Sequence, residues 1–328
     1  MELRQLKYFL AIAECGSFSR AAERVFVAQS ALSHQMAQLE AELGAGLFHR
    51  SRRGVTLTEA GQRFLPHAVS ILRQTEEAVL SARSDSEGPS GKVVFGIPHS
   101  VSNALALPLL RAVRRTLPKV QLELTEELTG NLATQLRAGQ IHLAVLFDDG
   151  TLPEFAWTPL LRERMYLIGP AQPKPGHRAS GIALRQALSQ PLILPARPHG
   201  VRPLIEAAAQ QAGLAAPNVV ADISSISILR TSLLAGLGQT LLPLMPLKAE
   251  IDAGLLQATA VRSPPLERLL ALCASPHIPL SAAAQAVARQ VRVLVGELCR
   301  DRAWPGATLV TADAGPDGQG PGRAARRR

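Results

Sequence analysis

Aromatic residues and cysteine are scarce in this chain of 328 residues, and long apolar runs are absent. Aromatic residues make up 4% of the sequence and apolar residues 47%, so its cores must consist mainly of leucine, valine, isoleucine and alanine. Cys15, Cys273 and Cys299 are odd in number and far apart, which argues against a disulfide framework and fits a reducing compartment. No run approaches the roughly 18 apolar residues of a membrane span, and the N-terminus lacks a signal peptide's pattern. We therefore expect a soluble, cytoplasmic protein with no membrane partner.

Motifs for catalysis and cofactor binding are missing as well. The sequence has no nucleophile elbow and no phosphate-binding loop of the P-loop type. Gly236 and Gly238 resemble part of a dinucleotide-binding fingerprint, but the third glycine is missing and the segment precedes an apolar strand instead of following one. The histidines and cysteines show no metal-ligand spacing. We expect no enzyme activity, no cofactor and no metal site.

Positive charge is concentrated locally, although the whole chain carries a net charge of +9. Residues 1–92 contain 11 Lys and Arg against 10 Asp and Glu, so this region is almost neutral. Within it, the segment HRSRRG holds three arginines in four successive positions, and no acidic residue lies between Leu43 and Leu57. Arginine suits phosphate oxygens and narrow minor grooves. Arg50, Arg52 and Arg53 are therefore candidates for contact with a DNA backbone, which would supply affinity with little sequence choice.

The first 57 residues predict three helices followed by a basic turn or hairpin. Apolar residues recur at helical spacing in a first helix (Leu6, Phe9, Leu10, Ala13), a second (Ala21, Ala22, Val25) and a third (Leu32, Met36, Leu39, Leu43). Gly16 ends the first helix, and either Ser17 or Ser19 can cap the second. Gly44 and Gly46 end the third. This order is typical of a winged helix-turn-helix, in which the second helix of the pair enters the major groove N-terminus first.

The third helix has a small, polar outer face. At about 100° per residue, Ser30, Ser33, His34 and Ala37 lie opposite the apolar stripe that contains Leu32. A bulky face would be held away from the bases, and an acidic face would be repelled by phosphate. Hydroxyl, imidazole and amide groups can pair with base edges or phosphates. The candidate groove contacts are Gln29, Ser30, Ser33 and His34.

A long helix is predicted after the basic turn. Thr56 and Glu59 match the S/T-x-x-E capping box, which places the helix start near Leu57. Apolar positions then alternate at spacings of three and four, in a heptad-like seam: Leu57, Ala60, Phe64, Ala68, Ile71, Thr75, Ala78 and Ala82. The preceding domain is too small to cover such a helix, so we expect it to pair with a second copy of the chain. Pro66 removes one hydrogen bond and predicts a kink.

The pattern changes after residues 84–92, which read as a linker. Short apolar runs of strand type follow, at residues 93–97, 120–124, 141–147, 165–169, 191–195, 218–223 and 240–244. Helical segments separate most of them, at 103–117, 130–138, 201–212 and 225–236, and a last helix covers 281–299. This alternation predicts an α/β domain with mainly parallel sheets, and its length suggests two lobes. The expected domains are 1–57, 58–90 and 91–300, with a disordered basic tail at 301–328.

The segment LKYFLAIAECGSFSRAAERVFVAQSALSHQMAQLEAELGAGLFHRSRRGVTLTEAG closely resembles the N-terminal domain of LysR-type transcriptional regulators. The later segments GKVVFGI, LTGNLATQLRAGQIHLAVLF and LLAGLGQTLLP are similar to runs in that family's periplasmic-binding-protein-like effector domain. The resemblance covers about residues 1–300, and HRSRRGVTLTEAG and IPHSVSN look most like its nitrogen assimilation control group. Two positions depart from the family pattern: His142 stands where the family commonly has Asp, and Pro66 lies inside the linker helix.

The resemblance implies a multidomain α/β protein in which a winged helix-turn-helix and a linker helix precede a two-lobed effector domain. Its implied partners are operator DNA, a small effector and a second copy of the chain in a homodimer or homotetramer. RNA polymerase is a further candidate partner, and the implied location is the nucleoid. The implied effector contacts are Pro98, His99, Ser100, Ser102, Thr129, Phe147, Arg197, His199 and Ser225. Hydroxyls and free N–H groups at helix N-termini bind anions, so the expected effector is a small carboxylate metabolite.

Two functions compete for this sequence. One is a sequence-specific transcriptional regulator whose DNA binding responds to a small molecule. The other is a solute-binding or enzymatic α/β protein with an incidental helical N-terminus. Residues 17–57 discriminate between them, because the second function leaves the helix pair and the basic turn unexplained.

Overall fold

The structure is a computed structural model, and it describes residues 1–51, 54–83, 88–148, 152–171, 181–196, 201–275 and 278–310. Two compact units make up the chain. The first contains residues 1–146, 150–157 and 272–291, and the second contains residues 147–149, 158–271 and 292–328. Four predicted site residues lie outside the described residues, namely Arg52, Arg53, Arg197 and His199. None of the helices among the described residues is both long and apolar enough to cross a membrane.

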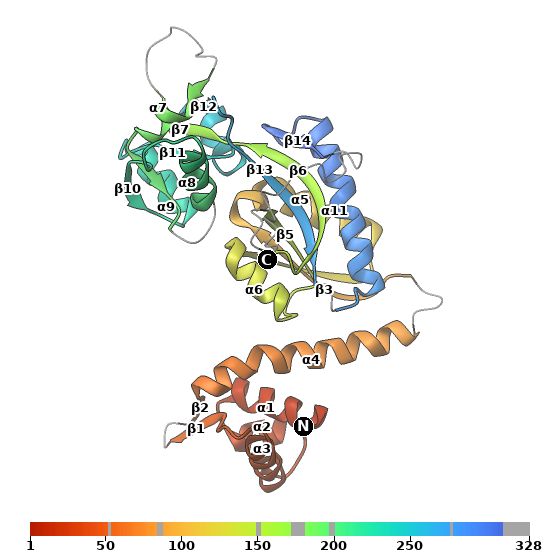
Figure 1. The fold of residues 1–328 in the computed structure, drawn as a ribbon. Coiled ribbons are helices and arrows are strands. Elements are labelled where there is room, and N and C mark those ends of the chain that lie inside the picture. Colours follow the sequence, from red (N-terminus) through yellow and green to blue (C-terminus); the bar gives the residue numbers. More distant parts are fainter. Residues whose placement is uncertain are drawn as a thin grey trace, which may run out of the picture. The chain divides into compact units, whose positions relative to one another are not determined.

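The first unit begins with a three-helix domain and a hairpin (Figure 1). These elements are α1 (Leu3–Cys15), α2 (Phe18–Arg24), α3 (Gln29–Leu43), β1 (Phe48–Ser51) and β2 (Gly54–Leu57). Gly16 ends α1 in the left-handed conformation at φ 60°, as predicted. Ser17 caps α2, where its hydroxyl accepts a hydrogen bond from the Arg20 amide. The basic turn is a hairpin, because β1 and β2 pair antiparallel from Phe48↔Leu57 to Ser51↔Gly54.

The predicted apolar stripes form the core of this domain. Leu32, Met36 and Leu39 on α3 are fully buried, whereas Leu43 at the end of the helix is exposed. Phe9 lies at the centre, with its ring 5.2 Å from that of Phe48 and 5.1 Å from that of Phe64. Such tilted and edge-on aromatic pairs add to the stabilisation from area burial.

The long helix α4 (Glu59–Arg83) begins two residues later than predicted. The capping box assigned to Thr56 and Glu59 is wrong, because Thr56 lies in β2 and pairs with His49. Thr58 performs the capping function. Its Oγ1 accepts from the Gly61 amide at 3.0 Å and donates to the Gly46 carbonyl at 2.7 Å. The helix continues through Pro66.

Part of the predicted pairing seam of α4 is occupied by its own domain. Ala68 is fully buried in the N-terminal core, and Ala60, Phe64 and Ile71 pack against that core. This part of the seam is therefore largely covered within the chain, by α1 and the hairpin strand β2.

The second half of α4 contacts a loop of the α/β region within the same unit. Ser70 Oγ donates to the Gly139 carbonyl at 3.3 Å, and Arg73 Nη1 donates to the Gln140 carbonyl at 2.5 Å. Glu77 pairs with Arg73 Nε at 3.2 Å and with His142 Nε2 at 2.5 Å. The Val94 amide donates to His142 Nδ1 at 2.9 Å, so the ring proton of a neutral His142 lies on Nε2 and faces Glu77.

The α/β region contains a six-stranded sheet with the strand order β14-β6-β13-β5-β3-β4. The strands are β3 (Gly91–Pro98), β4 (Val120–Glu127), β5 (Leu143–Asp148), β6 (Ala156–Arg164), β13 (Glu267–Ala274) and β14 (Ala307–Leu309). Its helices are α5 (His99–Thr116), α6 (Thr129–Arg137) and α11 (Ala282–Arg300). Strand β3 pairs in parallel with β4 and β5, which puts the carboxyl ends of three strands at one edge.

A second sheet has the order β11-β7-β12-β8, and β9 and β10 form a parallel pair. The strands are β7 (Tyr166–Pro170), β8 (Ile182–Ala183), β9 (Leu192–Leu194), β10 (Val219–Asp222), β11 (Thr240–Leu242) and β12 (Leu256–Arg262). The helices here are α7 (Leu184–Leu188), α8 (Arg202–Gln211), α9 (Ile226–Leu234), α10 (Lys248–Asp252) and the 3-10 helix η1 (Met245–Leu247). A continuous leucine-, isoleucine- and alanine-rich core joins these elements. The predicted α/β class with two lobes is confirmed, but the sheets are mixed, because β7 pairs antiparallel with both β11 and β12.

The start of the predicted disordered tail is ordered instead. After α11 the chain turns, and Ala307–Leu309 form strand β14, which pairs antiparallel with β6. Trp304 is buried and its Nε1 donates to Glu163 at 2.7 Å. Burial of this ring and its hydrogen bond order residues that composition alone marked as disordered. Residues 311–328 lie outside the described residues.

Candidate nucleic-acid interface and ligand site

The outer face of α3 presents the predicted polar groups to the surface. Gln29, Ser30 and His34 are exposed, and Ser33 is half-buried at the edge of the face. The opposite side of the helix is the buried stripe of Leu32, Met36 and Leu39. This division follows from the 3.6-residue period, which turns one side of α3 into the core and leaves the small side chains outside.

The N-terminus of α3 has no side-chain cap. Ala28 occupies the N-cap position, and no acidic residue lies in the first turn. The first N–H groups of the helix therefore keep their capacity to donate, and the helix dipole favours a negative charge in front of them. Gln29 also meets α2, because Ser19 Oγ donates to its Oε1 at 3.4 Å.

The hairpin positions Arg50 through an aromatic contact. Its guanidinium lies over the ring of the buried Phe18, 4.1 Å from the ring centre, while the residue stays exposed. Stacking on a ring leaves guanidinium N–H groups free to donate to phosphate. Arg52 and Arg53, which separate Ser51 from Gly54 in the sequence, lie outside the described residues.

A close backbone approach fixes the hairpin against the α1–α2 turn. The Val55 amide donates to the Gly16 carbonyl at 3.0 Å. Gly54 has φ 125°, and a Cβ added there would lie 2.9 Å from the same carbonyl oxygen. Only glycine satisfies both conditions, so Gly54 holds the hairpin in place. The sequence signals the turn through this glycine but gives no sign of its partner.

The structure places some of the predicted effector contacts of the α/β region close together and leaves others apart. The register Pro98↔Glu127 places the ends of β3 and β4 side by side, so α5 and α6 start at the same edge of the sheet. Both helices lack a side-chain cap. Thr129 is the first residue of α6, and its Oγ1 is buried without a hydrogen-bond partner. At the junction of β3 and α5, Pro98 and Ser100 are buried. Ser102 Oγ donates to the His99 carbonyl at 3.1 Å.

His99 already has an anionic partner. Its Nδ1 lies 2.6 Å from Glu126 Oε1, and Glu127 accepts from the Asn131 amide group at 3.1 Å. These acids at the end of β4 reduce the positive potential that two helix N-termini would otherwise create. His99 is therefore engaged in pairing within the chain, a feature that sequence reasoning missed.

Two of the remaining predicted contacts belong to the second unit. The ring of Phe147 at the end of β5 lies over the guanidinium of Arg268 at 3.8 Å, and the ring is buried. Ser225 caps α9, with its Oγ accepting from the Ile228 amide at 3.5 Å and bonded to Ser227 Oγ at 2.9 Å. Sequence reasoning missed Ser224, which accepts from the Ala196 amide at 3.2 Å. No group of His, Cys, Asp or Glu suited to a metal occurs among the described residues.

Comparisons with known proteins assign both regions of the chain. Residues 3–62 match the bacterial regulatory helix-turn-helix protein, lysR family, and residues 86–294 match the LysR substrate binding domain. The nitrogen assimilation regulatory protein nac of Klebsiella aerogenes is 36% identical, over 88% of this chain and 93% of that protein. The chain belongs to the LysR family of transcriptional regulators.

Other relatives agree with this LysR-family assignment. The nitrogen assimilation regulatory protein nac of Escherichia coli K12 is 32% identical, over 93% of this chain and 99% of that protein. The fold is similar to full-length CbnR complexed with its target DNA, at a TM-score of 0.64 and 24% identity, covering 90% of this chain and all of that one. The chain is thus a DNA-binding transcriptional regulator with an effector-binding domain, and the solute-binding or enzymatic alternative is rejected.

Proposed function

We propose that this LysR-family regulator reads DNA sequence through the outer face of α3 and holds the duplex through the arginines of the β1–β2 hairpin. The observation that carries the proposal is the exposed face of Gln29, Ser30 and His34 opposite a fully buried stripe. These side chains are short or flat enough for the helix to approach base edges. Gln29 can pair with adenine, and the hydroxyls and His34 can bond to bases or phosphates.

Affinity comes from the hairpin in this proposal. Arg50 is exposed and held over Phe18, and Arg52 and Arg53 follow it in sequence. Contacts from arginine to phosphate release counterions, so binding should weaken steeply as salt rises. The near-neutral charge of residues 1–92 is compatible with this function, because the arginines lie together in a segment without acids.

The proposed effector is a small carboxylate that binds at the carboxyl ends of β3 and β4. The uncapped N-termini of α5 and α6 and the unpaired Oγ1 of Thr129 support this class of ligand. His99 contributes in this proposal only if the ligand displaces Glu126, since the two are paired in the free chain. We retain residues 58–90 as the connection between a DNA-binding domain at 1–57 and an effector domain at 91–300.

DNA binding tests the proposal directly. Fluorescence anisotropy with the DNA upstream of the chain's own gene, at two salt concentrations, should give a sequence-preferring affinity that falls with salt. Arg50→Ala should weaken binding to all sequences to a similar degree and lower the salt dependence by about one phosphate contact. Gln29→Ala should relax the preference at one base pair, by roughly ten- to a hundredfold.

Gln38→Ala is the matched control for Gln29→Ala, because Gln38 is an exposed glutamine on the same helix but lies nine residues further from the end that is expected to enter the groove. Its sequence preference should equal that of the wild type. Binding without any salt-sensitive preference would refute the proposed function. Identical effects of Arg50→Ala and Gln29→Ala would refute the division between phosphate and base contacts.

A further inference from the structure

Phe26 stands out in the turn between α2 and α3. Its side chain is 94% exposed, whereas the next most exposed large apolar residue described, Leu237, is 66% exposed. Its neighbours Val25 and Val27 are both half-buried, so the turn does have room for apolar side chains on its inner side. Phe26 thus exposes a large apolar surface that the domain core does not use.

The backbone at Phe26 is unfavourable for phenylalanine. The Val27 amide donates to the Ala22 carbonyl at 3.0 Å, and the Phe26 amide donates to the Glu23 carbonyl at 3.3 Å. This pair of bonds is the Schellman motif that ends a helix, and it places Phe26 in the left-handed position at φ 55°. Glycine, or sometimes asparagine, fits that position, while a side chain with an aromatic ring is strained there. The chain therefore holds a bulky aromatic residue in a left-handed backbone conformation that suits glycine.

Backbone strain of this kind clusters at functional sites. We propose that Phe26 is a further sequence-reading residue, whose ring contacts the methyl group of a thymine in the major groove beside α3. The proposal rests on the proposed DNA-binding function. Phe26 comes three residues before Gln29, at the end of α3 that is expected to enter the groove first. Apolar contact with the thymine methyl is a known means of direct readout for phenylalanine.

The surroundings of Phe26 favour DNA over a protein partner as the occupant. The exposed residues on either side are Glu23, Arg24, Ala28, Gln29 and Ser30, so the ring is the only large exposed apolar side chain between residues 23 and 30. Protein partners usually dock on contiguous apolar patches of several hundred square ångströms. One large ring beside polar and small side chains instead matches the major groove, where a thymine methyl group lies among hydrogen-bonding base edges.

The test combines changes in the protein with changes in the DNA. Phe26→Gly and Phe26→Asn remove the ring and introduce residues that suit the left-handed position, so both should raise the melting temperature of the full chain while lowering DNA affinity. Each thymine of the operator is then replaced in turn by deoxyuridine, which lacks only the methyl group. Wild-type affinity should fall about fourfold at the contacted thymine, the amount that burial of one methyl group supplies. The Phe26 variants should show no further loss at that position.

Leu237→Ala serves as the control, because it removes another exposed apolar side chain from a loop of the second unit. It should leave both affinity and the deoxyuridine effect unchanged. Wild-type binding that is insensitive to deoxyuridine at every thymine would overturn the inference, as would variants that keep full affinity. Absence of any preferential binding to the operator would instead overturn the proposed function, so the two failures are distinguishable.

Discussion

At the scale of single residues, the second unit contains a buried charge cluster, whose ionised groups must compensate one another because water does not reach them. Glu163 on β6 is 1% exposed and Arg268 on β13 is 5% exposed. Arg268 donates to Glu163 Oε2 through Nε at 2.9 Å and Nη2 at 2.6 Å, and Trp304 donates to Oε1. Burial lowers the pKa of Arg268, and the charge of Glu163 opposes that change. The cluster joins β6, β13 and the segment after α11.

Breaking this pair from one side should be costly, because it leaves a buried charge without compensation. Glu163→Gln keeps the size and an acceptor for Trp304 but removes the negative charge beside Arg268. We expect a loss of about 3 kcal/mol in the free energy of unfolding, measured by urea titration and tryptophan fluorescence.

Glu123→Gln provides the matched control. Glu123 pairs with Lys92 at 2.7 Å on the surface, and both side chains are about half exposed. Its loss should cost less than about 1 kcal/mol. Equal effects of the two substitutions would show that burial does not determine the contribution of the Glu163–Arg268 pair.

At the scale of elements, α4 shows where a sequence pattern is informative and where it is ambiguous. A long amphipathic helix after a basic hairpin was predictable, since its apolar spacing is regular over seven turns. Its start was not, because Thr56 and Thr58 both precede acceptable helical residues and only the pairing of β2 decides between them. The face of α4 that pairs with a second copy of the chain was also ambiguous, because α4 carries a second apolar stripe next to the predicted one.

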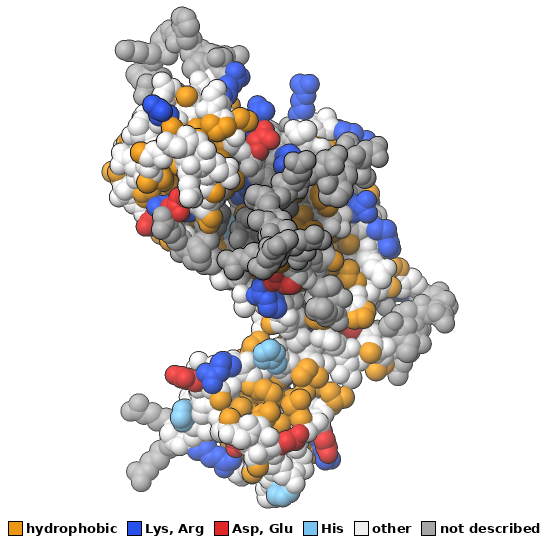
Figure 2. Space-filling view, viewed as in Figure 1, with side chains coloured by type: hydrophobic (Ala, Val, Ile, Leu, Met, Phe, Trp, Pro, Cys, Tyr) orange, Lys and Arg blue, Asp and Glu red, His pale blue; other side chains and the backbone are white. Residues whose placement is uncertain are grey.

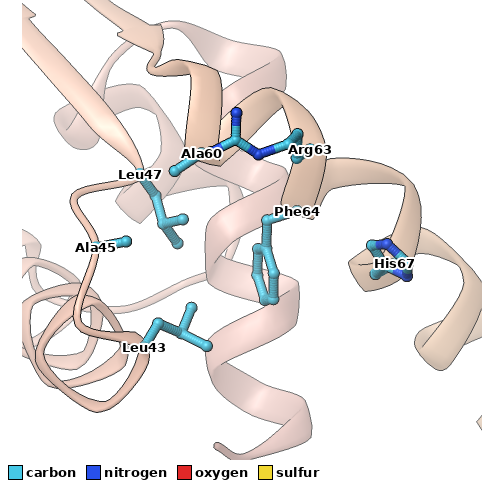
Figure 3. Close-up of a pocket in the computed structure, with 7 residues that line it drawn as sticks. All are labelled: Leu43, Ala45, Leu47, Ala60, Arg63, Phe64 and His67. Atoms are coloured by element: carbon cyan, nitrogen blue, oxygen red, sulfur yellow. The ribbon is translucent and has the colours of Figure 1, made fainter.

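The second stripe of α4 remains partly open to solvent. It contains Leu65, Val69, Leu72 and Val79 at heptad-like spacing, with Val69 41% and Val79 46% exposed. Figure 2 shows hydrophobic side chains gathered on the surface of the N-terminal region. A pocket between the end of α3 and α4 adds to this open apolar surface (Figure 3), and it is lined by Leu43, Ala45, Leu47, Ala60, Arg63, Phe64 and His67. A partner helix would bury both features.

We expect this surface of α4 to form the homodimer. Val69→Asp should shift the chain from dimer to monomer in sedimentation analysis, because a desolvated carboxylate in an apolar helix pair is unfavourable. Val220→Asp makes the same change at an equally open valine on β10, which is 53% exposed, and should leave the mass unchanged. An unaltered mass for Val69→Asp would place the dimer contact elsewhere.

At the scale of the whole molecule, the alternation of strands and helices indicated the class of the fold but missed five strands, β6, β8, β12, β13 and β14. β6 and β12 escaped prediction because polar and charged residues interrupt their apolar residues, as in Ala156–Arg164, whereas β13 was overlooked although residues 269–274 form an uninterrupted apolar run. They are strands because neighbouring strands supply their hydrogen bonds, which a linear pattern does not record. The ordered turn at Trp304 depends in the same way on Glu163, 141 residues earlier. The polar face of α3 was predictable because one helix contains all of it, whereas pairings such as His99–Glu126 join residues far apart in sequence.

We expect the contact between α4 and residues 139–142 to couple effector binding to DNA binding. Arg73 bonds to the Gln140 carbonyl, and Glu77 faces the Nε2 proton of His142. An aspartate at position 142 would place two carboxylates together here, so His142 and Glu77 suit one another. A movement of this loop would be transmitted to α4 and to the helices packed on its first half.

Coupling through α4 can be measured as a ratio of affinities. A thermal-shift panel of small mono- and dicarboxylates should identify a ligand that stabilises the full chain. Operator DNA should then change the chain's affinity for that ligand by some factor, and the ligand should change the affinity for operator DNA by the same factor. Arg73→Ala should bring this factor close to one, because it removes the bond to Gln140 and the ion pair with Glu77. Arg111→Ala removes an equal charge from an exposed position on α5 and should leave the factor unchanged. A factor that survives Arg73→Ala undiminished would mean that the signal reaches DNA by a route other than this contact.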